Sequence, residues 1–136
     1  VMLEQFPRTQ IDVFIEVIQA DAGTRIASLT AASVALANAG IPMKDLVVGC
    51  TAGKVEGRIV LDLSKEEDNF GNADLPMAVL SKTDEVVLIQ MDGELTKDEL
   101  NKGMEMILKA TKRINEIQRK ALSEKYTIDQ NKEEGE

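Results

Sequence analysis

The sequence predicts an α+β fold, in which a mixed β-sheet has helices packed against it. Short stretches that alternate apolar and polar residues are typical of strands, and two longer stretches repeat apolar residues at helical spacing. Turns rich in Gly and Asp separate these stretches. The predicted order is strand, helix, two strands, two strands, helix. With 136 residues, of which 43% are hydrophobic, the chain can bury one core.

The first strand and helix are joined by a glycine turn. Residues 11–18 alternate Ile and Val with Asp, Phe and Glu, which predicts a strand. Residues 24–39 are small and apolar and are followed by Gly40-Ile41-Pro42, which predicts a helix and its end.

The turn itself is a candidate anion site. A helix N-terminus offers unpaired N–H groups and positive dipole charge, and Gly23 lets the backbone approach an oxyanion. Arg25 could add a two-pronged cationic clamp of the kind that phosphate favours. From these residues alone an alternative stays open, in which Thr24 only caps the helix and Arg25 is solvated.

Two pairs of strands are predicted in the middle of the chain. The turn residues between and after them are typical of hairpins and strand ends. The expected strands are 46–54 and 58–63, joined at Glu56-Gly57, then 75–80 and 85–91, joined at 81–84, with Asp92-Gly93 breaking the last one.

An acidic loop is expected between the strand that ends near Leu63 and the one that begins at Leu75. Asp68 and Asp74 stand at the two ends of its polar core. Paired carboxylates can provide a general acid and an orienting or metal-binding partner, because each alters the pKa of the other. They can equally be ordinary turn residues, since Asp, Asn and Gly are common in loops.

The last element is a long helix. Thr96 and Glu99 form a capping box at its start. Residues at helical spacing predict the face that packs on the core: Leu100, Gly103, Met104, Ile107, Ala110, Ile114, Ile117 and Ala121, with Leu122 beside its end. From Thr127 the polar, acidic composition predicts a disordered tail.

Composition excludes several classes of protein. The chain has no His and one Cys, Cys50, on a predicted buried strand, which excludes Cys–His zinc sites, His-dependent triads and an internal disulfide. A lone cysteine suits a reducing cytoplasm, and no apolar run approaches the ~20 residues of a membrane span. Sixteen basic and 24 acidic residues give a net charge of −8, so a chain of this charge would need basic surface from elsewhere to hold a polyanion.

Four motifs, in order, resemble the RNase PH family. They are the stretches 6–13, 19–25, 35–43 and 66–76, which read FPRTQIDV, QADAGTR, ALANAGIPM and EEDNFGNADLP. Within the family the chain looks most like the catalytic RNase PH-type subunit of the archaeal exosome. Bacterial RNase PH, which acts on tRNA 3′ ends, is the next most similar, but it usually carries an insertion before the residues that match Ile41-Pro42. A non-catalytic ring subunit typically lacks both the phosphate motif and the paired aspartates.

This resemblance implies phosphorolytic 3′→5′ degradation of single-stranded RNA, with inorganic phosphate as co-substrate and nucleoside 5′-diphosphates as products. It implies that Gly23, Thr24 and Arg25 hold the phosphate. Asp68 matches the general acid, and Asp74 matches a second carboxylate that supports the site or a divalent cation, Mg²⁺ or Mn²⁺. Phosphoryl transfer depends mainly on positioning and charge stabilisation, which suits this set of residues.

The resemblance also implies an organisation and partners. We expect residues 1–126 to be the C-terminal portion of an RNase PH-like domain, one half of a duplicated fold, and 127–136 to be the disordered tail. The expected partners are a homologous non-catalytic subunit in a hexameric ring and RNA-binding cap subunits, in the cytoplasm and away from membranes. A non-catalytic subunit that binds RNA without cleaving it remains the alternative.

Overall fold

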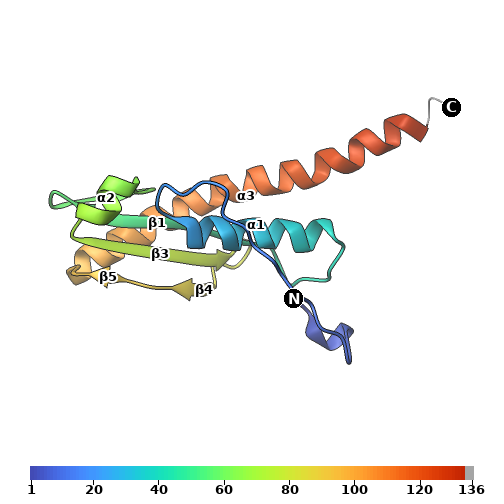
Figure 1. Cartoon of the computed structure of the whole chain (residues 1–136), viewed down its shortest axis with the longest axis horizontal. Helices are drawn as coiled ribbons and strands as arrows, with labels where there is room; N and C mark the ends of the chain where they lie inside the picture. The colour runs from blue at the N-terminus through green and yellow to red at the C-terminus, as the bar shows by residue number, and fades with distance from the viewer. Residues whose placement is uncertain (134–136) are drawn as a thin grey trace.

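The computed structural model describes the backbone of residues 1–133 and the side chains through Lys125. A five-stranded sheet with helices on both faces makes up the body of these residues (Figure 1). Its helices are α1 (Thr24–Asn38), α2 (Lys65–Phe70) and α3 (Lys97–Glu133), after a short 3₁₀ turn at Leu3–Gln5. The predicted α+β class is confirmed.

The sheet has the strand order β2-β1-β3-β4, with β5 paired to β3 beyond the end of β4. The strands are β1 (Val47–Val55), β2 (Arg58–Leu61), β3 (Ala73–Leu80), β4 (Val86–Ile89) and β5 (Asp92–Gly93). The β1–β2 turn is at Glu56 and Gly57 as predicted, and both have positive φ (48° and 75°), as two-residue hairpin turns require. All pairings among the described residues are antiparallel, so the mixed sheet predicted from the sequence lacks its parallel part.

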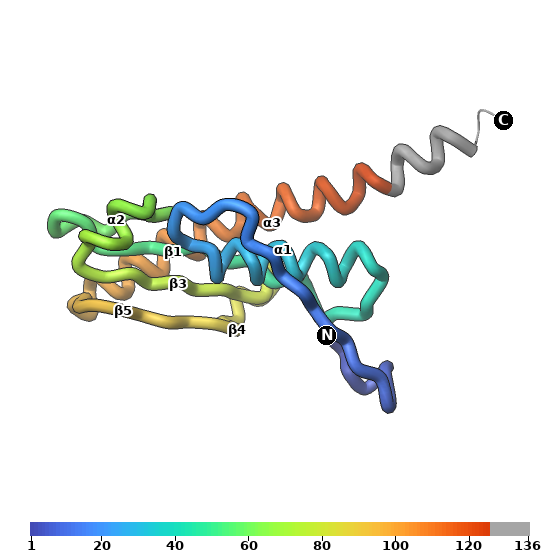
Figure 2. Tube along the Cα trace, viewed as in Figure 1, coloured from blue at the N-terminus to red at the C-terminus, as the bar shows by residue number. Residues whose placement is uncertain are grey.

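The parallel part is missing because residues 11–18 are outside the sheet. The predicted strand there is wrong for this structure: the segment is extended coil with exposed side chains, Phe14 at 91% and Ile18 at 98%. A strand needs a hydrogen-bonded neighbour, and no described residue pairs with this segment. In Figure 2 it runs as a blue tube past α1.

The two long helices cover opposite faces of the sheet. On β1, the Cβ missing from Gly49 would lie 2.8 Å from a methyl group of Ile26 in α1. On the other face, Gly103 of α3 lies against Leu75 and Ala52, with 3.2 Å and 3.5 Å to its missing Cβ. Small residues at these positions therefore allow each helix to approach the strands closely. The core lies between the sheet and α3: Val48, Cys50, Ala52, Ile59, Leu75, Met77, Val79 and Ile107.

Helix α3 begins as predicted and buries a somewhat different face. Glu99 accepts the Thr96 N–H at 2.8 Å, and Thr96 Oγ1 accepts the Glu99 N–H at 3.3 Å, which confirms the capping box. Ile117 is 62% exposed and Ala121 is also exposed, contrary to prediction. Polar residues take the buried positions there, Thr111, Asn115 and Gln118.

Gln118 shows why polar residues are accepted on that face. Its side-chain amide donates to the carbonyl oxygens of Val47 (3.1 Å) and Thr30 (3.4 Å), so its burial satisfies backbone groups of both β1 and α1. The backbone of α3 continues as helix through Glu133, beyond the expected start of the tail, and residues 134–136 lie outside the described residues. No helix in the described part of the chain is long and apolar enough to cross a membrane.

Candidate anion and carboxylate site

The chain enters α1 through two consecutive left-handed residues. Ala22 and Gly23 both have φ of 60°, and Gly23 is the N-cap, with no side-chain cap bond. A left-handed alanine costs roughly 1–2 kcal/mol, so this turn is held in shape by its surroundings. The side chain of Thr24 does not cap the helix, contrary to the alternative in which capping is its only role. By helix geometry the N–H groups of Thr24 and Arg25 have no acceptor within α1, which leaves them available to an anion.

Arg25 projects from the first turn of α1 toward the strands. Its guanidinium donates a hydrogen bond to the side-chain oxygen of Gln90, which lies between β4 and β5. Arg25 is exposed, but it is not merely solvated, because this bond fixes one of its nitrogens beside the sheet.

Asp68 lies in helix α2 rather than in a loop, so the predicted loop is wrong over residues 65–70. The sequence carried the signal for this helix: Ser64 Oγ accepts the Glu67 N–H, and the Glu67 carboxylate accepts the Ser64 N–H at 2.8 Å, a capping box. The first helical N–H, that of Lys65, donates to the Asp21 carboxylate at 3.0 Å. This contact ties α2, and with it Asp68, to the turn before α1.

Asp74 lies in strand β3, at its second residue, rather than at the end of a loop. Its direct cross-strand neighbour is Asp92 of β5. Burial raises the pKa of Asp74 above the ordinary value, the negative charges of Asp68 and Asp92 raise it further, and Arg25 opposes this shift. Asp74 is therefore a carboxyl that holds its proton more readily than an isolated one.

One small cavity of about 160 Å³ brings the predicted residues together. Turn, helix and strand residues from separate parts of the chain line it: Ala22, Gly23, Thr24, Arg25, Ile26, Thr51, Asp62, Leu63, Asp68, Asp74 and Pro76. The five site residues predicted from the sequence therefore line one cavity. They come from two motifs more than 40 positions apart.

Sequence reasoning missed Asp62 and Gln90. Asp62 follows β2, has a positive φ of 58° and donates its N–H to the Thr51 carbonyl at 2.8 Å. This places Asp62 on the cavity wall. An aspartate directly after a strand was the available signal. Nothing local in the sequence marks Gln90, because its contact depends on the pairing of β4 with β3.

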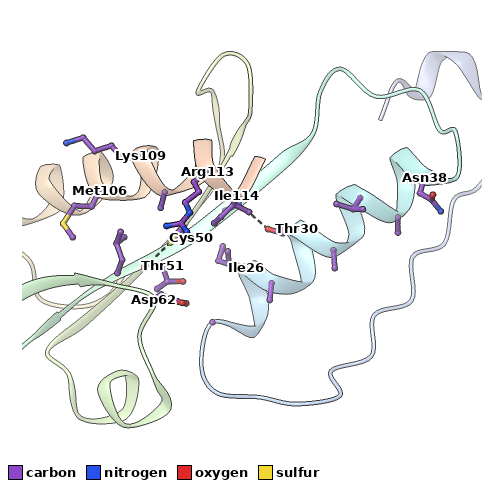
Figure 3. A pocket seen from close by; sticks show the side chains of 18 residues that line it. Ile26, Thr30, Asn38, Cys50, Thr51, Asp62, Met106, Lys109, Arg113 and Ile114 are labelled. Carbon is purple, nitrogen blue, oxygen red and sulfur yellow. Dashed lines mark hydrogen bonds between the residues drawn. The ribbon is translucent and has the colours of Figure 1, made fainter. Parts of the chain in front are cut away.

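A larger groove of about 1140 Å³ adjoins the cavity and shares Gly23, Ile26, Thr51 and Asp62 with it. Figure 3 shows α1 on one side and α3 on the other, with Met106, Lys109, Arg113 and Ile114 labelled on α3. The groove follows the free part of β1, because β2 pairs only with residues 52–55. There Ser33 Oγ accepts the Val47 N–H at 2.8 Å, so a helix side chain replaces a neighbouring strand.

A divalent cation at Asp74 is the other ligand predicted for this site. Among the described residues, no group of three or more His, Cys, Asp or Glu side chains is arranged to hold a metal ion. Asp74 as a ligand therefore remains a prediction.

Comparison with known proteins identifies the family. Residues 45–110 match the model of the 3′ exoribonuclease family, domain 2, and residues 1–42 match the model of domain 1 of the same family. The chain belongs to the 3′ exoribonuclease family. The resemblance to RNase PH proteins that the motifs indicated is confirmed.

Two relatives illustrate how similar this family member is to others. The exosome complex component Rrp41 of Thermoplasma volcanium is 69% identical over 129 residues, which are 95% of this chain and 52% of the relative. Rrp41 of Pyrococcus abyssi is 61% identical over 125 residues, 92% of this chain and 50% of the relative. The chain thus spans about half the length of the curated relatives it matches.

Solved structures support the fold. Rice (Oryza sativa) Rrp46 superposes with a TM-score of 0.73 at 24% identity, over 78% of this chain and 51% of that one. Cell-death-related nuclease 5 of C. elegans gives 0.71 at 15% identity, over 79% and 60%. These identities are low, so the likeness concerns the arrangement of helices and strands.

Proposed function

We propose that this chain carries the phosphate site and the acid of a phosphorolytic 3′→5′ exoribonuclease that shortens single-stranded RNA. One observation carries the proposal: a helix N-terminus with Arg25 and two carboxyl groups, Asp68 and Asp74, line the same cavity. An anion-binding turn beside an acid is what attack by phosphate on a phosphodiester requires.

In the proposed reaction, inorganic phosphate lies against the N–H groups at Gly23–Arg25 and the Arg25 guanidinium. A phosphate oxygen attacks the last phosphodiester phosphorus of the RNA. The bond from phosphorus to the 3′ oxygen breaks, and its electron pair goes to that oxygen, which takes a proton from Asp68. The products are a nucleoside 5′-diphosphate and an RNA one nucleotide shorter.

Asp74 supports this step as the second carboxyl of the pair. Its burial and its acidic neighbours raise its pKa and favour the protonated form, so Asp74 retains a proton more readily than an exposed carboxylate would. We also propose that the Asp74 carboxylate, once deprotonated, is the group nearest to a Mg²⁺ or Mn²⁺ ion, which would offset the negative charge of phosphate and RNA.

The same proposal extends to the assembly. The matched relatives are exosome components, which favours an exosome ring over a bacterial-type RNase PH acting on tRNA ends. A ring with a homologous non-catalytic subunit, capped by RNA-binding subunits in the cytoplasm, would supply the basic surface that a chain of net charge −8 lacks.

The test uses the full-length protein in its assembled complex with single-stranded RNA, with and without inorganic phosphate. We expect nucleoside 5′-diphosphates only when phosphate is present. Binding of RNA without any diphosphate release would favour the non-catalytic alternative, and release of monophosphates without phosphate would indicate hydrolysis. Repeating the assay with a chelator and with added Mg²⁺ or Mn²⁺ tests the metal.

A further inference from the structure

Gln90 occupies a break in the sheet beside the proposed phosphate site. It follows the last residue of β4 and precedes β5, and its N–H donates to the carbonyl of Pro76 on β3 at 3.0 Å. Its side-chain oxygen accepts the hydrogen bond from Arg25. Gln90 therefore connects the edge of the sheet with the cationic side chain of the anion turn.

Pro76 explains the break. In an antiparallel ladder every other facing pair is a hydrogen-bonded pair, whose two residues exchange two N–H···O bonds, but proline has no N–H to donate. Gln90 gives its bond to Pro76, and Pro76 cannot return one. β4 accordingly ends at Ile89, and pairing resumes where Asp92 lies opposite Asp74.

The register places Gln90 on the functional face. Gln90 is two residues from Asp92, and the opposite residues Pro76 and Asp74 are likewise two apart, so all four side chains share one face of the sheet. Pro76 and Asp74 line the cavity. The face of the sheet that carries Asp74 thus also carries the acceptor that holds Arg25.

We propose that Gln90 is a positioning residue that orients Arg25 for phosphate, an inference that rests on the proposed phosphate site. Arg25 is on the surface, and a free arginine there would lose rotamer entropy when it closed on the anion. A hydrogen bond made in advance reduces that loss. Glutamine suits this role because its side-chain oxygen is neutral. It accepts a hydrogen bond from the guanidinium and leaves the positive charge of Arg25 free to attract phosphate.

The test measures KM for phosphate and kcat in the assembled full-length enzyme. For Gln90→Ala we expect KM for phosphate to rise roughly three- to tenfold, the effect of losing one hydrogen bond to a charged group at an exposed site, with KM for RNA unchanged. Gln90→Glu should raise KM for phosphate more, because its carboxylate pairs with Arg25 and phosphate must displace it. The exposed neighbour Met91 provides the control. Met91→Ala should leave KM for phosphate and kcat unchanged.

A double variant separates orientation from general damage. In an Arg25→Ala background, Gln90→Ala should have no further effect on KM for phosphate, because the guanidinium that Gln90 holds has gone. Equal KM values for wild type and Gln90→Ala would overturn the inference while leaving the phosphate site intact, and so would additive effects in the double variant. A wild-type enzyme without phosphate dependence would instead overturn the proposed function itself, and with it this inference.

Discussion

Replacing Asp68 with Asn tests the proposed acid most directly. Asp68 is exposed in the first turn of α2, and the capping box that starts this helix uses Ser64 and Glu67 instead. The fold should therefore lose only the favourable contact of one carboxylate with the helix dipole, about 0.3–1 kcal/mol. Asn keeps the size of the side chain but has no carboxyl proton to give, so kcat should fall by at least ~100-fold, the usual contribution of a general acid.

The matched control is Glu66→Gln, which removes the same charge from the same helical turn outside the cavity lining. Both variants would be assayed in the assembled enzyme for diphosphate release, and RNA binding would be measured separately. We expect Glu66→Gln to turn over normally and both variants to bind RNA. Near-normal phosphorolysis by Asp68→Asn would refute the assignment of the acid, and an equal loss in both variants would show that α2 charge rather than proton transfer matters.

Four further results are expected. Arg25→Ala should raise KM for phosphate roughly ten- to hundredfold, with only partial recovery in Arg25→Lys, as measured by kinetics at varied phosphate. A lysine hydrogen bond holds the pKa of Glu99 at about 2, below its ordinary 4.5. The stabilisation of the folded state by ionised Glu99 is therefore present above pH 4.5 and is lost as pH falls toward 2. In urea unfolding, Glu99→Gln should be less stable than wild type near neutrality, and this difference in stability should shrink as pH falls from 4.5 toward 2. Gly53→Ala should cost about 1–3 kcal/mol in the same assay, because its Cβ would lie 2.5 Å from a leucine methyl and 2.7 Å from a carbonyl oxygen. The isolated 136-residue chain should self-associate in light scattering through its exposed apolar side chains, and Phe14→Ser with Ile18→Ser should reduce association without lowering the unfolding midpoint.

The sequence predicted most of the candidate site because its parts are short and local. A glycine turn entering a helix specifies a candidate anion site within five residues, and Arg25 belongs to the same turn. The hairpin at Glu56-Gly57 and the capping box at Thr96 were predictable for the same reason, since neighbouring residues determine them. The sequence motifs do not predict that these residues line one cavity, because that arrangement depends on the pairing of β1 with β3.

The wrong predictions concern features that depend on distant partners. Residues 11–18 have the alternation of a strand, but the hydrogen bonds of a strand come from a neighbour, and none of the described residues supplies one. The buried face of α3 turns toward Gln118 instead of Ile117 because backbone carbonyls of Thr30 and Val47 lie there to accept its amide. The helix α2 differs from these cases, because its capping box is a local signal in the sequence that predicts the helix.

The charges around the cavity link the anion turn to the acid. Asp62, Asp68 and Asp74 line it, and Arg25 is the one basic residue in its lining among the described residues. A phosphate anion held at the turn adds negative charge beside these carboxyls, which raises the pKa of Asp74 in the same direction as burial already does. Binding of the nucleophile would thus favour the protonated form of Asp74, which keeps a proton inside the cavity that the leaving oxygen would enter. Arg25 opposes that shift and in the proposed reaction would hold the phosphate as well, so the orientation that we propose Gln90 gives it would affect both halves of that reaction.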